Sequence, residues 1–312
     1  MGSRKQVGFH RALIFCVIAF TLAWAATLGM RLIGAPLPAP NRYRSILDAM
    51  SFRPWFALCA FAALLPPALA IILAGRWETR ITEWGLRTPR GLIVLLAPMV
   101  ALAIQLTAIA LTVGSGIGRF DATGTAQIER LTEQKEYTDA WETEYELQST
   151  MNPALRRMVV GVIAGLVIGA AASPIIEIAW RGLLYTELRW IGFARCSLLV
   201  GVLAAAWWVP CLIMAPMAGA QTLTAGVRLA ALALLGVPLA WLREATRSII
   251  PGAVLVTSWV ALLELPPMMV LDASDLQTAL TTFTATGLLA GVALMRPPAA
   301  IREPDEEAQE GE

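Results

Sequence analysis

The feature that most constrains this chain is its division into long apolar runs separated by short charged stretches. Residues 91–113 and 158–173 contain no charged side chain. Charged residues make up 15% of the 312, whereas about a quarter is usual in soluble proteins. A helix needs roughly 20 apolar residues to cross a bilayer, and it satisfies its own backbone hydrogen bonds there. The sequence therefore predicts an all-α, polytopic transmembrane helical bundle.

The apolar runs predict about eight membrane spans. They cover residues 12–30, 55–75, 91–113, 158–180, 197–217, 229–242, 249–271 and 280–295. The sixth is short, and Glu264 with Pro266-Pro267 interrupts the seventh. We divide the chain into a three-span region (1–113), a polar, helical extramembrane segment (114–157), a five-span core (158–295) and a disordered acidic tail (296–312). In the polar segment, Tyr137, Trp141 and Tyr145 share one helix face, which packs on the bundle or the lipid interface, or binds a partner.

Basic residues predict the orientation, because cytoplasmic connectors carry an excess of Arg and Lys. With both termini in the cytoplasm, the inner segments hold 14 basic residues and the short outer connectors hold 5. The inner set is Arg4, Lys5, Arg11, Arg76, Arg80, Arg87, Arg90, Arg181, Arg189, Arg195, Arg243, Arg247, Arg296 and Arg302. The outer set is Arg31, Arg42, Arg44, Arg53 and Arg228. The segment 114–157 is left out because long loops translocate largely regardless of charge.

Several functions and targeting classes are disfavoured by composition. A net charge of +1 gives no case for a nucleic-acid partner. The cysteines form no Cys-x-x-Cys pair and lie in or beside apolar runs, as buried small hydrophobes do: Cys16, Cys59, Cys196 and Cys211. The first apolar run is longer than the roughly 7–15 residues of a signal-peptide core, so we expect an uncleaved helix. The chain has one histidine, His10, in the basic N-terminal stretch.

The candidate site is the segment 174–182, which follows the uncharged run 158–173. Glu177 lies near the end of the predicted fourth span, where a carboxylate is costly unless it is paired. Arg181 follows four residues later, the spacing at which two side chains meet on one helix face. The pair therefore holds the helix end as a structural ion pair, or it lines a polar cavity that binds a peptide or lipid tail.

The segment Pro174-Ile175-Ile176-Glu177-Ile178-Ala179-Trp180-Arg181-Gly182 resembles the first motif of the CPBP family. That family comprises CAAX prenyl proteases and bacteriocin-processing enzymes, also called Abi, which are glutamate-dependent intramembrane metalloproteases. Their first motif reads Glu-Glu-x-x-x-Arg. Alignment on Trp180-Arg181-Gly182 places the second glutamate at Glu177 and the catalytic first glutamate at Ile176.

The other two motifs of the family also have matching surroundings. The second, Trp-His-x-Pro, is similar to Trp207-Trp208-Val209-Pro210, with Trp208 in place of the histidine. The third begins Ser-Ile-x-Pro, as at residues 248–251, and then has a histidine and an asparagine. These two positions fall near Val256 and Val260, or one or two residues later, on Thr257 or Ser258. The resemblance covers roughly residues 155–295.

The resemblance implies a zinc held by two histidines, but the matching positions cannot supply it. The apolar Ile176 cannot take a proton from water, and His10 lies outside the core. Other residues near the spans have no ligand spacing: Glu187, Glu244, Glu264, Cys196 and Cys211. No Gly-x-Ser-x-Gly motif supports a serine hydrolase. We expect no catalytic residue and no metal or other cofactor, with zinc only in an active enzyme.

These observations predict a non-catalytic CPBP-type protein of the bacterial cytoplasmic membrane. It would bind a membrane protein, a peptide or a lipidated tail, with Trp180, Trp207 and Trp208 as candidate cavity residues. One alternative is an active CPBP-type peptidase with atypical site residues. The other is a small-molecule transporter, against which the chain shows no two-half repeat.

Overall fold

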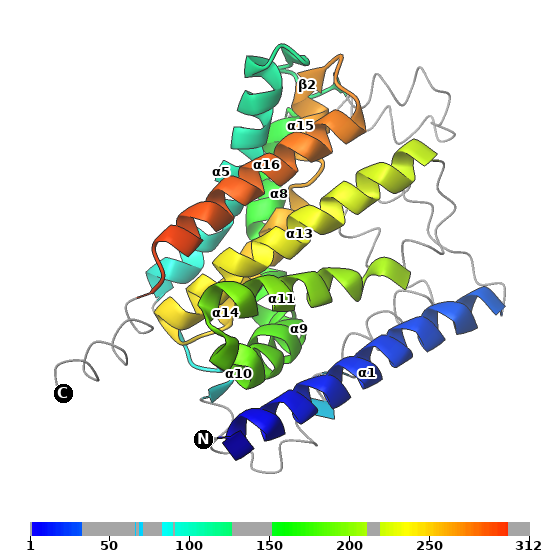
Figure 1. Ribbon diagram of the computed structural model, residues 1–312. Helices are drawn as coiled ribbons and strands as arrows, with labels where there is room; N and C mark the ends of the chain where they lie inside the picture. Colours follow the sequence, from blue (N-terminus) through cyan, green and yellow to red (C-terminus); the bar gives the residue numbers. More distant parts are fainter. Residues whose placement is uncertain are drawn as a thin grey trace.

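The computed structural model describes residues 2–32, 66, 69–70, 83–89, 91–126, 152–210 and 219–298. These residues are mostly helical, as predicted (Figure 1). Four helices are long and apolar enough to cross a membrane: α1 (Gly2–Leu32), α5 (Gly91–Gly114), α13 (Gly219–Thr246) and α16 (Asp275–Met295). A bent pair, Pro153–Gly169 with Pro174–Ile191, makes a fifth if it is one span. The fold is compatible with an integral membrane protein.

The described residues therefore do not contain eight span-length helices. The predicted span at 55–75 and the helix with Tyr137, Trp141 and Tyr145 lie outside them, as do Cys59 and Cys211. Two other predicted spans are represented by shorter helices, α11 (Phe193–Ala206) and α14 (Ile250–Ala261). The 12 residues of α14 extend about 18 Å, against a hydrocarbon core of roughly 30 Å. Proline at the start of α15 (Leu265–Met269) separates it from α14.

Two helices are longer than the sequence predicted. Helix α1 begins at Gly2 rather than near residue 12, so His10 lies on a helix and not in an unstructured tail. Helix α13 begins at Gly219, before both starts that the sequence allows for the sixth span, residue 229 or near Ala225. The extra turns of α13 tolerate the charged Arg228 because its guanidinium donates to Glu264 at 2.9 Å. A paired charge at a helix end does not terminate the helix.

A two-stranded antiparallel sheet is the exception to the all-helical prediction. Strand β1 (Arg119–Phe120) pairs with β2 (Val270–Leu271), with Arg119 opposite Leu271. Backbone hydrogen bonding between the two segments continues beyond the paired strands, since the N–H of Asp121 donates to the carbonyl of Met269 at 2.8 Å. This short sheet attaches the start of the polar segment to the chain that follows α15.

The helix expected to form a straight fourth span is broken. It runs through α8 (Pro153–Ala164), the π-helix η2 (Gly165–Gly169), α9 (Pro174–Glu177), the π-helix η3 (Ile178–Leu184), α10 (Tyr185–Leu188) and the 3-10 turn η4 (Arg189–Ile191). Its two arms are bent by 60° at residues 170–173. Pro174 lacks a backbone N–H and suits the first turn of a new helix, so the second arm starts there.

Glycines allow the first arm of the broken span to lie directly against α14. Gly161, Gly165 and Gly169 are spaced four residues apart, so they share one helix face. A Cβ atom at Gly165 would collide with the Ser258 hydroxyl, and one at Gly161 would collide with Leu262. Small residues bring membrane helices into close contact in this way. The same device lets α11 approach α13, where Gly201 meets Gly236.

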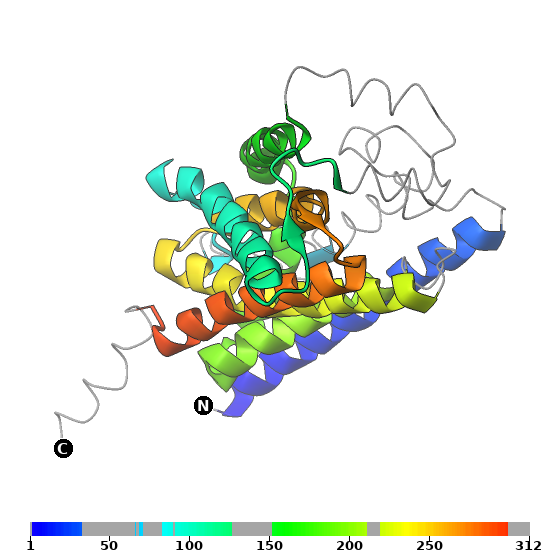
Figure 2. The ribbon, with the colours of Figure 1, turned by 90° about the horizontal axis from the view of Figure 1, so that it is seen from above.

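The connectors predicted to share one membrane face meet at one end of the molecule. Arg243 at the end of α13 donates to the carbonyl of Glu83, and Arg11 of α1 pairs with Glu187 at 3.5 Å. Figure 2 shows α1, α11, α13 and α16 running alongside one another. The β1–β2 pair lies at the opposite end (Figure 1). The two contacts gather the start of α1, the end of α13 and residues 83 and 187 at this end.

Candidate functional site

An ion pair forms between Glu177 and Arg181, as their spacing predicted. The Nη1 of Arg181 donates to Oε1 of Glu177 at 2.9 Å. Both residues are buried, with 2% of Glu177 and 3% of Arg181 exposed. The pair does not lie at the end of a straight span, because it follows the bend and its arginine belongs to the π-helical η3. Such π-helical segments are rare and are frequently found at functional sites.

The ion pair is only half satisfied. In the part of the chain that the structure describes, Oε2 of Glu177 and Nε and Nη2 of Arg181 are buried without a hydrogen-bond partner. Nε and Nη2 form one edge of the guanidinium, the fork that recognises two acceptors side by side. A buried polar atom without a partner costs free energy. The pair therefore retains hydrogen-bonding capacity that its immediate neighbours do not use.

A row of aromatic rings packs beside this segment and links three elements. Phe15 of α1 meets Trp180 of η3 edge to face, with ring centres 5.6 Å apart. Trp180 then meets Trp207 at 6.1 Å, and Trp207 meets Trp208 at 5.1 Å. The indole N–H of Trp207 donates to the carbonyl of Ala19 at 3.2 Å, which anchors α1 to the end of α11. The row runs from buried rings to Trp208, which is 36% exposed.

The positions aligned with the family's catalytic residues are only partly brought together. Ile176 is half-buried and packs on the cluster that contains Trp180 and Trp207. Val256 packs on a different core cluster, which includes Trp259, and Val260 is 51% exposed. The first and second motifs therefore share one cluster, whereas the Val256 and Val260 positions lie outside it.

A polar contact between the residue before Pro174 and α14 is made by Thr257. Its hydroxyl lies 2.6 Å from the hydroxyl of Ser173, at the bend just before Pro174. Thr257 also donates to the carbonyl of Ala253, one turn earlier in α14. This contact joins the bend to α14.

The residues considered as substitute ligands are engaged in separate contacts. Glu187, Glu244 and Glu264 each pair with a different arginine, Arg11, Arg243 and Arg228 respectively. The buried thiol of Cys196 donates to the carbonyl of Tyr185 at 3.5 Å, and His10 lies exposed on α1. Across residues 2–32, 83–89, 91–126, 152–210 and 219–298, no group of three His, Cys, Asp or Glu side chains is placed to hold a metal.

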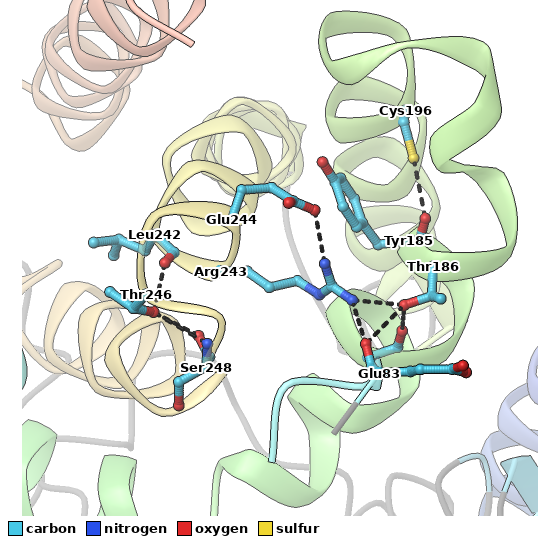
Figure 3. A network of polar contacts seen from close by, with 10 residues as sticks. Glu83, Tyr185, Thr186, Cys196, Leu242, Arg243, Glu244, Thr246 and Ser248 are labelled. Carbon is cyan, nitrogen blue, oxygen red and sulfur yellow. Dashed lines mark hydrogen bonds and ion pairs between the residues drawn. The ribbon is translucent and has the colours of Figure 1, made fainter. Parts of the chain in front are cut away.

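A second buried arginine, which the sequence analysis counted only as a connector charge, is surrounded by partners (Figure 3). Arg243 donates through Nη1 to Glu244 at 2.8 Å and through Nη2 to the carbonyl of Glu83 at 2.8 Å. Nη2 also donates to the hydroxyl of Thr186 at 2.6 Å. Its guanidinium carbon lies 4.8 Å above the ring centre of Tyr185. These residues form the Arg243 clamp.

The Arg243 clamp fastens the connector at residues 83–89 to the helices. The adjacent turn adds two contacts, because the Ser248 hydroxyl donates to the carbonyl of Arg87 at 2.7 Å and the Ile249 N–H donates to that of Gly85 at 2.9 Å. Gly85 has a φ of 78°, a conformation that glycine adopts easily. In the sequence, Arg243 and Glu244 directly follow the apolar run 229–242, and these adjacent charges are the signal that could have drawn attention to Arg243.

No protein-family model and no curated protein matches this chain.

Proposed function

We propose that this chain is an integral membrane protein that works by binding rather than by hydrolysis, on a CPBP-type scaffold without a metal centre. Its guest would be a membrane protein, a peptide or a lipidated tail. The observation that carries the proposal is the engagement of Glu177, the acid retained from the first motif, with Arg181 inside the protein. A general base must lie within hydrogen-bond reach of the water that it deprotonates, whereas Glu177 is 2% exposed and its Oε1 accepts from Arg181.

The residues at the other family positions support the same conclusion. Ile176, Trp208 and Val256 have no group that could bind zinc or accept a proton from water. The imidazole, thiol and carboxylate groups of the described ranges form no group of three that could hold a metal. The scaffold retains the packing residues of the motifs, such as Trp180 and Pro210, and lacks the reactive ones.

The aromatic row supports binding of a guest with apolar groups. Its rings lie edge to face from Phe15 to Trp208, and the last ring is partly exposed. Tryptophan combines a large apolar surface with one polar N–H and is enriched where proteins bind partners. In a membrane, such a guest would approach from the lipid side of α1 and α11.

The topology is part of the proposal. We propose eight crossings, with the N- and C-termini on the cytoplasmic side of a bacterial cytoplasmic membrane. The meeting of Arg243, Glu83, Arg11 and Glu187 at one end supports this arrangement, because all four belong to predicted inner connectors. Single cysteines placed in a cysteine-free chain would test it by labelling from each side. Labelling of the 114–157 segment from the cytoplasm would contradict it.

The decisive test of the binding proposal is elemental analysis combined with a cleavage assay. Protein purified in detergent should carry less than about 0.1 zinc per chain and leave a prenylated CAAX peptide intact. One zinc per chain that is lost in Glu177→Ala, together with cleavage, would establish the peptidase alternative. Flux of a solute into proteoliposomes, with no zinc and no cleavage, would establish the transporter alternative.

A further inference from the structure

We infer that the half-satisfied ion pair in the broken span is a binding site for a neutral group that carries both a hydrogen-bond acceptor and a hydrogen-bond donor, as a secondary amide does. This inference rests on the proposed binding function and names the chemistry of its guest. The acceptor would meet Nε and Nη2 of Arg181, and the donor would meet Oε2 of Glu177. Three buried atoms without partners on two adjacent side chains are the observation behind it.

The backbone around the Glu177–Arg181 pair is irregular, as it often is at binding sites within membrane helices. The span is bent by 60°, and the π-helices η2 and η3 lie on either side of the short helix α9. Membrane proteins tolerate irregular backbone at this depth where it is buried in protein or lines a cavity. Discontinuous helices in transporters place their polar groups on the substrate in this way. The break at Pro174 positions Glu177 and Arg181 one and two turns into the second arm.

Charge decides between a neutral guest and an anion. The guanidinium fork alone would fit a carboxylate or phosphate. Here Glu177 already neutralises Arg181, so an anion would leave a net negative charge where both residues are at most 3% exposed. Burying an uncompensated charge is far more costly than burying a neutral group with its hydrogen bonds made. An amide satisfies the acceptor and the donors and leaves the site neutral.

The Arg243 clamp shows why a free guanidinium fork distinguishes Arg181. Nε of Arg243 is also buried without a partner, but the Nη2 beside it is not free. Both nitrogens at the end of the Arg243 side chain have protein partners, and its flat face lies on Tyr185. Arg243 therefore serves as the matched control for Arg181. Replacing either arginine by lysine keeps the charge and removes the planar fork, but only the change at Arg181 should affect a bound amide.

The test is thermal melting of the full chain in detergent with N-methylacetamide or sodium acetate as the probe. N-methylacetamide should raise the melting temperature of the wild type and of Arg243→Lys by about 2–4 °C. It should not raise that of Arg181→Lys, and acetate should raise none of the three. An equal rise with acetate, a rise retained in Arg181→Lys, or no rise in the wild type would overturn the inference. The last outcome would assign the free atoms to ordered water.

An infrared measurement on the wild type keeps the inference testable if Arg181→Lys does not fold. Carbonyl-labelled N-methylacetamide should show a bound band at lower frequency, displaced by excess unlabelled compound; a single free band would contradict the site.

The outcomes of these experiments can be told apart from the outcomes of the zinc and cleavage tests of the proposed function. If the protein is free of zinc and inactive but shows no amide band, only the chemistry of the guest is wrong. Stoichiometric zinc with cleavage would instead overturn the proposed function.

Discussion

Two buried arginines in this protein are held in opposite ways. Arg243 is surrounded by a carboxylate, a carbonyl, a hydroxyl and an aromatic ring that come from three parts of the chain. Among the described residues, Arg181 has one hydrogen-bonding partner, Glu177, four residues earlier on the same arm of the broken span. Both residues are almost completely buried, at 6% and 3% exposed. Burial alone therefore does not distinguish a structural arginine from one that retains unused hydrogen-bonding capacity.

The difference follows from where each arginine lies. Arg243 closes a long helix against the connector at residues 83–89, so each of its contacts joins segments distant in sequence. Arg181 lies within a π-helical turn, and its one contact spans four residues. Contacts between distant segments hold those segments together, whereas the Glu177–Arg181 pair matters mainly because either residue alone would leave a buried charge. We therefore expect different responses to substitution at the two sites.

The largest effect is expected from removing one member of the Glu177–Arg181 pair. Glu177→Ala or Arg181→Ala leaves a single buried charge, which costs about 3–5 kcal/mol in the free energy of unfolding. Thermal or denaturant melting in detergent would measure the loss. Near-wild-type stability for both variants would show that water reaches the pair, and would return Glu177 to consideration as a catalytic base.

A somewhat smaller loss, about 3 kcal/mol, is expected for Arg243→Ala. The substitution removes two charge-assisted hydrogen bonds to neutral groups and one to Glu244, but Glu244 retains some access to solvent. The connector should also loosen, so limited proteolysis should cut within residues 83–89 sooner than in the wild type. Thr186→Val removes one partner only and serves as the graded control. Unchanged proteolysis in Arg243→Ala would show that the clamp does not fasten the connector.

The sequence predicted the local pair and missed the Arg243 clamp, for a physical reason. A spacing of four residues fixes the geometry of Glu177 and Arg181 once a helix forms. The partners of Arg243 come from residues 83 and 186, and no local spacing brings those together. The apolar runs predicted helices reliably, because periodicity and length are local properties. The 60° bend, by contrast, follows an arm whose glycines pack closely on α14, a contact between segments distant in the sequence.

The double variant Glu177→Ala/Arg181→Ala should lose less stability than the two single variants together. Removing both charges removes both desolvation costs, so the expected loss is about 2 kcal/mol, mainly from lost packing. The corresponding double variant Arg243→Ala/Glu244→Ala should give no such recovery, because the carbonyl of Glu83 and the hydroxyl of Thr186 lose a donor in either case. Additive losses at residues 177 and 181 would reject the pairing.

The smallest effect concerns Asp121, a carboxylate outside the membrane helices that is satisfied more fully than Glu177. Burial alone would raise the pKa of Asp121. Hydrogen bonds from the Thr123 hydroxyl and from the N–H groups of Thr123, Thr125 and Ala126 outweigh this effect and lower the pKa below its ordinary value. A carboxyl group with a lowered pKa in the folded state stabilises the fold above its unfolded pKa of about 3.9. That contribution disappears as the pH falls through the lower, folded value.

Asp121→Asn keeps one acceptor oxygen and loses the second, which accepts from Thr125 and Ala126. We expect it to lower stability at pH 7 by less than about 1 kcal/mol, since Asp121, although 7% exposed, lies between the exposed residues 120 and 122. The melting curves of wild type and variant should converge as the pH falls from 5 to 2.5. Asp272→Asn is the control, because its ion pair with Arg119 is largely exposed and such pairs contribute little. If the Asp121→Asn difference persists unchanged in acid, the carboxylate charge does not hold this turn. The contrast between fully and partly hydrogen-bonded charged groups would then apply only to Arg243 and Arg181.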